Sequence, residues 1–161
     1  MGQYYRAVAI GEDNRPKNFA RSYDFDNGAK LMEHSYIHNN FVNSFELSLL
    51  RTGVNYKSKI VWAGDYADEI HGENNDYDLC DEKIKLNDGI DFSKDPSEEF
   101  KDYLKRVEEH INDYPFLINH TNKEFVDKRK IWAKHNQDGD WAIHPLPLLT
   151  ADGNGQGGAI S

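Results

Sequence analysis

The fold is decided by the stretch KIVWAGDYAD, which spans residues 59–68. Its apolar run from Ile60 to Ala63 stops at a glycine, and two aspartates, Asp65 and Asp68, follow within a few residues. A short apolar run that ends in this way is typical of a buried strand whose loop carries polar groups at the edge of a sheet. We therefore predict a central strand over residues 59–64.

The chain before this strand predicts a hairpin and a helix. Residues 3–10 (QYYRAVAI) and 17–25 (KNFARSYDF) are rich in strand-forming side chains, and turn residues separate them. Asp26 or Asn27 is placed to cap a helix that ends near Gly53. Apolar residues recur every four positions along it, which predicts one helical face packed on a sheet.

The chain after the strand predicts an acidic connection, a helix and a second hairpin. Residues 65–95 form the connection, within which residues 81–86 suit a short edge strand. The sequence DPSE, residues 95–98, has the order of an N-terminal helix cap and predicts a helix to about residue 112. Two strand-like runs, residues 116–121 and 124–131, then predict a hairpin.

Residues 141–150 (WAIHPLPLLT) predict a last strand at a sheet edge, because its two prolines lack the donors of an inner strand. Residues 151–161 are rich in glycine and predict a flexible tail. The order ββαβ–acidic loop–αβββ indicates an α+β fold, with one mixed or antiparallel sheet of about five or six strands and two helices on one face. We expect residues 1–150 to form a single domain.

Composition is typical of a water-soluble globular protein. The 161 residues suffice for one domain, and an aromatic content of 12% supplies large side chains for a core. Cys80 is the single cysteine, which excludes an intramolecular disulfide and favours a reducing cytoplasm. The sequence shows no signal segment and no apolar run of membrane-spanning length, so we expect a cytoplasmic protein.

The net charge of −9 originates in one segment. Residues 65–99 contain 13 acidic and three basic residues, a net of −10, whereas the rest of the chain has 15 acidic and 16 basic residues, a net of +1. Such a segment repels nucleic acids and attracts a basic surface. The densest basic cluster, residues 128–130, gives little support to direct nucleic-acid binding, which we do not expect.

The first functional hypothesis is therefore an acidic interaction or inhibitor protein rather than an enzyme. Its expected partner is a basic protein surface, such as that of a nucleic-acid-binding complex, where carboxylates compete with phosphates. Interleaved tyrosines supply the anchors that interfaces favour. The residues expected to contact the partner are Asp65, Tyr66, Asp68, Glu69, Asp76, Tyr77, Asp78, Asp81 and Glu82.

A metal-dependent hydrolase or nuclease is the alternative hypothesis. Asp65, Asp68 and His71 follow the central strand, where carboxylates and an imidazole can bind a divalent cation. His34 and His38 stand four apart on the predicted helix and are a second candidate metal pair. No nucleophile motif is found, and the acidic neighbours of Cys80 favour its neutral thiol.

A small-ligand-binding module is the third hypothesis, with a pocket lined by Trp62, Tyr66 and Trp141. No cofactor is expected. The glycines of residues 153–158 fit the dinucleotide string G-x-G-x-x-G, but that fingerprint needs a following helix and only three residues remain.

Four phrases of the chain resemble those of an uncharacterised group of small bacterial and phage proteins. They are SYDF at residues 22–25, NGAKLMEHSY at 27–36, VWAGDYAD at 61–68 and HPLPLLTADGNG at 144–155. The group supplies no function to transfer. A small acidic protein of phage type without a catalytic motif is similar in character to host-defence inhibitors such as anti-CRISPR proteins.

Overall fold

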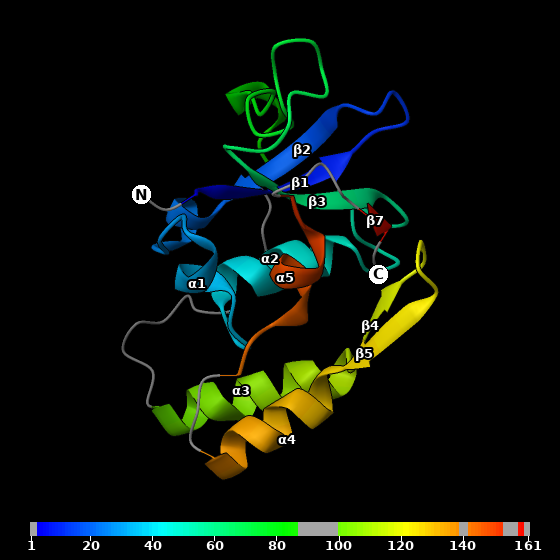
Figure 1. Cartoon of the computed structure of the whole chain (residues 1–161). Helices are drawn as coiled ribbons and strands as arrows, with labels where there is room; N and C mark the ends of the chain where they lie inside the picture. Colours follow the sequence, from blue (N-terminus) through cyan, green and yellow to red (C-terminus); the bar gives the residue numbers. More distant parts are fainter. Residues whose placement is uncertain (1–2, 87–99, 139–141, 153–157, 160–161) are drawn as a thin grey trace.

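A computed structural model of the chain describes residues 3–86, 100–138, 142–152 and 158–159. Its fold mixes helices and strands (Figure 1). The strands are β1 (Tyr5–Ile10), β2 (Pro16–Arg21), β3 (Lys59–Gly64), β4 (Phe116–Asn119), β5 (Glu124–Asp127), β6 (Ala151–Asp152) and β7 (Gly158–Ala159). The α-helices are α1 (Leu31–His34), α2 (Asn40–Ser48), α3 (Phe100–Asp113), α4 (Lys128–Asp138) and α5 (Pro145–Thr150), and two 3-10 helices are η1 (Ser22–Phe25) and η2 (Glu82–Ile84).

The predicted central strand is confirmed, and so is the first hairpin, except that its second strand ends at Arg21 and residues 22–25 form η1 instead of continuing it. β1 runs antiparallel to β2 on one side and to β3 on the other, with Ala7 opposite both Ala20 and Trp62. Two strands of two residues each complete the sheet on β3: β6 is parallel to it, and β7 is antiparallel. The stretch around Trp62 therefore lies at the centre of the sheet.

Both faces of this sheet are covered, because side chains that alternate along each strand enter two different cores. Ile60 and Trp62 point into a core shared with Phe41 and Phe45 of α2 and with Leu146 of α5. On the opposite face, the core of Val8, Ile10, Phe19, Val61 and Ala63 packs against Tyr77, Cys80 and Ile84. In Figure 1, α2 and α5 lie on one side of β3, and the green loop that follows β3 lies on the other.

Residues 100–138 form a helix–hairpin–helix unit, which we call the arm (α3, β4, β5 and α4). β4 and β5 pair antiparallel as a separate sheet of two strands, and α3 and α4 lie side by side in Figure 1. A small core joins the arm to the rest of the chain through Ile111 and Trp132 of the arm and through Ile37 and Ala142. Leu117 of β4 enters the core beneath the main sheet.

The prediction of one sheet of five or six strands is wrong, since β4 and β5 pair only with each other. The second hairpin exists, but its second strand ends at Asp127 instead of Ile131. There the Asp127 side chain accepts a hydrogen bond of 3.0 Å from the Arg129 amide, which caps the start of α4. The cap at Asp127 therefore begins a helix in residues 128–131, whose sequence had suggested a strand.

The last predicted strand is also wrong, because residues 145–150 form α5. Proline at the first helical position needs no amide donor, and the ring Nδ1 of His144 accepts the Leu146 amide at 3.1 Å. The two prolines that argued against an inner strand are therefore compatible with a helix start.

The long helix predicted after Asp26 is divided into α1 and α2. His38 has a φ of 77°, which no α-helix allows, and the Asn39 side chain accepts the Val42 amide at 3.1 Å to begin α2. Asp26 does not cap a helix start, since it ends η1 with a φ of 58°. The four-residue apolar spacing still marks buried residues, but Ile37 and Phe41 belong to different cores.

The predictions for the short edge strand and for the tail are also corrected. Residues 82–84 of the expected edge strand form η2. Four residues of the tail that we expected to be flexible, those of β6 and β7, pair with β3. Residues 87–99, with the acidic end of the connection and the predicted cap of α3, and Trp141 lie outside the described residues.

Candidate functional site

Residues 65–86 form a folded layer over one face of the sheet, which we call the acidic loop. Arg6 of β1 fixes it: the guanidinium lies 4.0 Å from the centre of the Tyr77 ring and donates to the Tyr77 carbonyl at 3.0 Å. Cys80 lies beside this contact, and burial raises the pKa of its thiol to about 12, so that the thiolate is not formed near neutral pH. Cys80 acts as a packing residue here.

Asn75 holds the beginning and the middle of the acidic loop together. Its side-chain amide donates to the carbonyls of Asp65 and Ala67 at 3.2 and 3.0 Å, and its side-chain oxygen accepts the Asp78 amide at 2.9 Å. Asn75 is 3% exposed, so these hydrogen bonds are shielded from water. The loop after the central strand is consequently a defined surface, although it has little regular secondary structure.

The residues expected to bind a partner divide into two groups. Asp65, Asp76 and Tyr77 are used inside the molecule: Asp65 accepts the Tyr4 amide at 3.0 Å, Asp76 is buried against His71, and Tyr77 stacks with Arg6. These three residues stabilise the loop from within. The exposed members are Tyr66, Asp68, Glu69, Asp78, Asp81 and Glu82.

The exposed members differ in how much the fold needs them. Asp81 accepts the Lys83 amide at 2.9 Å as the cap of η2, and Glu82 pairs with Arg21 and with Lys85. Within the described part of the chain, the exposed acids Asp68, Glu69 and Glu73 take part in no hydrogen bond or ion pair. Beside these acids in sequence lie two exposed apolar side chains, Tyr66 at 64% and Ile70 at 54%. We call Tyr66, Asp68, Glu69, Ile70 and Glu73 the outer acidic surface.

The structure does not bring the three residues of the candidate metal site together as ligands. The carboxylate of Asp65 is turned to the Tyr4 amide, Asp68 is exposed, and the Nε2 atom of His71 lies 2.7 Å from Asp76. Across residues 3–86, 100–138, 142–152 and 158–159, no group of three His, Cys, Asp or Glu side chains could hold a metal ion. The His71–Asp76 pair instead closes the turn that contains Gly72.

His34 and His38 are not a metal pair on one helical face, because His38 lies beyond the end of α1. His34 is fully buried, its Nδ1 bonds the Gly28 carbonyl at 3.0 Å, and its Nε2 accepts the Trp62 indole N–H at 2.8 Å. Burial lowers the pKa of His34, which keeps the ring neutral as these bonds require. His34 therefore ties the helical layer to the central strand.

Four ionisable residues form a buried group that the sequence did not reveal. The carboxylate of Glu46 on α2 pairs with Lys128 at the start of α4, and its second oxygen lies 2.7 Å from the Nε2 atom of His144. His110 of α3 completes the group, and the exposed fractions of the four residues are only 1–6%. We call Glu46, His110, Lys128 and His144 the Glu46 cluster.

The electrostatics of the Glu46 cluster follow from this packing. Burial by itself would raise the pKa of Glu46, but Lys128 and His144 outweigh burial and hold that pKa well below its usual range. Burial lowers the pKa of His110 to about 4, and Lys128 adds to the decrease. The Nδ1 atom of His144 accepts the Leu146 amide, so the neutral ring carries its proton on Nε2, which faces Glu46.

Lys128 was the first residue of the basic cluster noted in the sequence, and it is 1% exposed. Arg129 is paired with Asp127 at 2.9 Å. The basic run is therefore divided between a buried ion pair and a local surface pair. Neither Lys128 nor Arg129 is presented as an unpaired cation to a nucleic acid.

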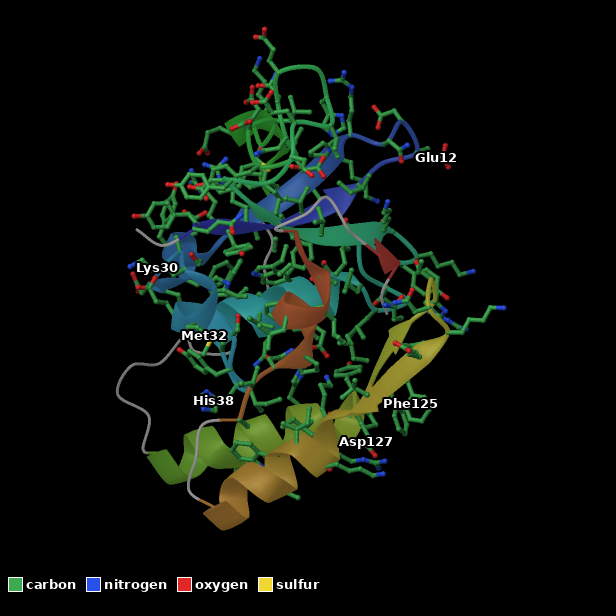
Figure 2. The ribbon with its side chains drawn as sticks, in the orientation of Figure 1. Glu12, Lys30, Met32, His38, Phe125 and Asp127 are labelled. Atoms are coloured by element: carbon green, nitrogen blue, oxygen red, sulfur yellow. The ribbon has the colours of Figure 1, made fainter. Side chains whose placement is uncertain are left out.

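Trp62 and Tyr66 of the predicted aromatic pocket do not share a cavity, since Trp62 is buried in the core and Tyr66 is 64% exposed. A groove of about 360 Å³ lies instead between the arm hairpin and α5. It is lined by Leu117, Lys123, Glu124, Phe125, Val126 and Leu149. Figure 2 shows Phe125 at the edge of the hairpin, far from Met32 on α1.

The comparisons with known proteins supply no relative: no family model, no curated protein and no solved structure matches this chain. Among the described helices, none has the length and apolarity needed to cross a bilayer.

Proposed function

We propose that the protein is an interaction protein that binds a basic protein surface through its outer acidic surface. The observation that carries this proposal is the contrast within the acidic loop. Its inner side is fixed by Arg6, Asn75 and a buried apolar core, while its outer side presents acids that the fold does not use. Because the backbone of the loop is already fixed, binding has to order only the side chains of these acids.

The outer acidic surface has the composition of a binding surface. Tyr66 and Ile70 are large exposed side chains among Asp68, Glu69 and Glu73. Aromatic and aliphatic anchors provide affinity at interfaces, and surrounding charges increase the association rate and select the partner. A partner rich in arginine would match both features, because a guanidinium pairs with carboxylates and stacks on tyrosine.

Arginine within the molecule already pairs with carboxylates and stacks on tyrosine in this way. Arg6 stacks on Tyr77, and Arg21 lies 4.4 Å from the Tyr23 ring centre while it pairs with Asp24 at 3.0 Å. A basic surface that normally binds phosphates would meet the same groups on the outer acidic surface. Binding there would compete with nucleic acid, as an inhibitor of a nucleic-acid-handling complex would.

Neutralising the surface tests the proposal. The variant Asp68→Asn, Glu69→Gln, Glu73→Gln removes three exposed charges that stabilise nothing in the described structure. We expect the binding of a fluorescent arginine-rich peptide to weaken by about tenfold at low salt, since each exposed charge pair contributes up to about 1 kcal/mol. Wild-type binding should fall as salt rises, and DNA should compete for the peptide.

A matched control removes three acids elsewhere: Glu12→Gln on the β1–β2 turn (labelled in Figure 2), Glu108→Gln on α3 and Glu124→Gln on the hairpin. This variant has the same net charge, so binding that depends on total charge would weaken equally in both. The proposal is wrong if the two variants lose the same affinity, or if neither loses any.

The groove beside the arm hairpin favours small-ligand binding as a second function. Its volume of about 360 Å³ is at the lower end of the range for ligand pockets, and Leu149 is 52% exposed at its edge. An anilinonaphthalene sulfonate dye is a suitable probe because it combines apolar rings with an anionic group. Leu149→Lys should abolish dye fluorescence, whereas Met32→Lys, a change of another exposed apolar residue, should not. Equal dye binding by both variants would exclude the groove.

A further inference from the structure

The Glu46 cluster connects the arm to the rest of the molecule. Glu46 belongs to α2, and His144 begins α5, whereas His110 and Lys128 belong to the arm. Apolar contacts also join the arm to the body, through the core around Trp132 and through Leu117. The charged cluster is a polar link between the two parts.

The Glu46 carboxylate and the Lys128 ammonium of this link compensate each other. His110 is 6% exposed and lies among Ile37, Ile111, Lys128 and His144. A proton on His110 therefore adds a poorly solvated positive charge beside an ion pair that is already balanced.

His110 is the member of the cluster whose protonation this buried packing opposes. It faces Glu46 from α2, Lys128 from α4, His144 from the start of α5 and His38 from the segment between α1 and α2. Asp113 at the end of its own helix and Tyr114 just after that helix also lie close to it. Lys128 and His144 oppose its protonation, while Glu46 and Asp113 favour it, and burial is the largest effect. If the arm separated from α2 and α5, His110 would lose the burial that is the main cause of its lowered pKa, although Lys128 belongs to the arm as well and would move with it.

We propose that the Glu46 cluster is an acid-sensitive latch: when His110 takes up a proton, the arm separates from α2 and α5 while the sheet of β1, β2 and β3 remains folded. Separation uncovers the apolar core of Ile37 and Trp132. The outer acidic surface lies on the opposite face of the sheet and keeps its structure. The device is therefore independent of the interaction proposed above.

Amide NMR spectra of the whole chain, recorded from neutral pH to about pH 4, test the latch. We expect the resonances of α3, β4 and β5 to lose dispersion at a pH where those of β1 and β3 are unchanged. The imidazole resonances of His110 should titrate with the same midpoint as the arm. A single transition of arm and sheet together would overturn the proposal, because His34 is buried against Trp62 and its protonation would unfold the sheet.

The variant His110→Gln removes the ionisable group from the cluster, and His120→Gln removes an exposed histidine of the hairpin turn as a control. The arm transition should disappear or move to lower pH in His110→Gln and stay unchanged in His120→Gln. Equal transitions in the two variants would contradict the latch. If His110→Gln does not fold, the comparison of imidazole and arm midpoints in the wild-type protein decides: different midpoints refute the proposal.

Discussion

Removing the Lys128 side-chain charge gives the sharpest test of the energetics of the fold. Lys128 is 1% exposed and Glu46 is 6% exposed, so the pair is almost fully shielded from solvent. The change Lys128→Met keeps the length and apolar stem of the side chain but leaves the Glu46 carboxylate buried beside His144 alone.

The expected loss is about 3–5 kcal/mol of unfolding free energy, the range for breaking a buried ion pair by removing one partner. For a domain of this size the midpoint of thermal unfolding should fall by about 6–12 °C for a loss of 3 kcal/mol. Urea unfolding followed by circular dichroism gives the free energy, and the slope should not change. Lys105→Met is the control, since Lys105 and Glu109 are 74% and 60% exposed and should contribute less than about 0.5 kcal/mol.

The double variant Glu46→Gln, Lys128→Met separates two contributions. If the cost arises from an isolated buried charge, neutralising Glu46 as well should restore most of the stability, because replacing a buried ion pair entirely is often nearly neutral. A loss below about 1 kcal/mol for Lys128→Met would refute the reasoning. So would a double variant that is less stable than the single one, since the pair itself would then be strongly stabilising.

Three further results are expected. Acid should destabilise the protein, because the pKa of His110 is about 4 in the folded state and 6.5 ordinarily. The stability that comes from keeping His110 neutral is complete above pH 6.5 and is lost as the pH falls towards 4, by about 3 kcal/mol of unfolding free energy measured in urea. An unfolding free energy that does not change with pH would contradict this. Gly53→Ala should lower the free energy of unfolding in urea by more than about 2 kcal/mol, because its added Cβ would lie 2.1 Å from the Ser48 carbonyl oxygen, and an unchanged free energy would show that the turn adjusts. Arg6→Met should release the acidic loop, and the half-buried Cys80 should then react with iodoacetamide at least about tenfold faster than in the wild type, measured by mass spectrometry; equal rates would show that Arg6 does not hold the loop.

The prediction of the sheet succeeded where local pattern and tertiary structure agree. The run around Trp62 has the length and glycine end of a buried strand, and the structure places it between β1 and two short C-terminal strands. The charge count also located the acidic loop correctly. It did not show that Asp76 and Tyr77 face inward, because that depends on Arg6, which lies 71 positions from Tyr77 in the chain.

The prediction of residues 128–150 failed because short elements depend on capping contacts and distant partners. Asp127 turns the end of β5 into α4, and His144 begins α5 while it contacts Glu46 nearly a hundred positions earlier. Strand propensity in residues 128–131 is weak compared with these contacts. The two prolines in the first turn of α5 could have indicated this helix, since they are compatible with a helix start as well as with an edge strand.

The sequence alone determined the central strand, the first hairpin and the position of the negative charge, since apolar runs, turn residues and ionisable groups are local properties. Tertiary structure alone decided which acids take part in contacts among the described residues and which do not. It also assembled Glu46, His110, Lys128 and His144, whose spacing along the chain has no pattern. The physical reason is that burial and pairing of charge depend on distances between elements, and only the packed chain sets those distances.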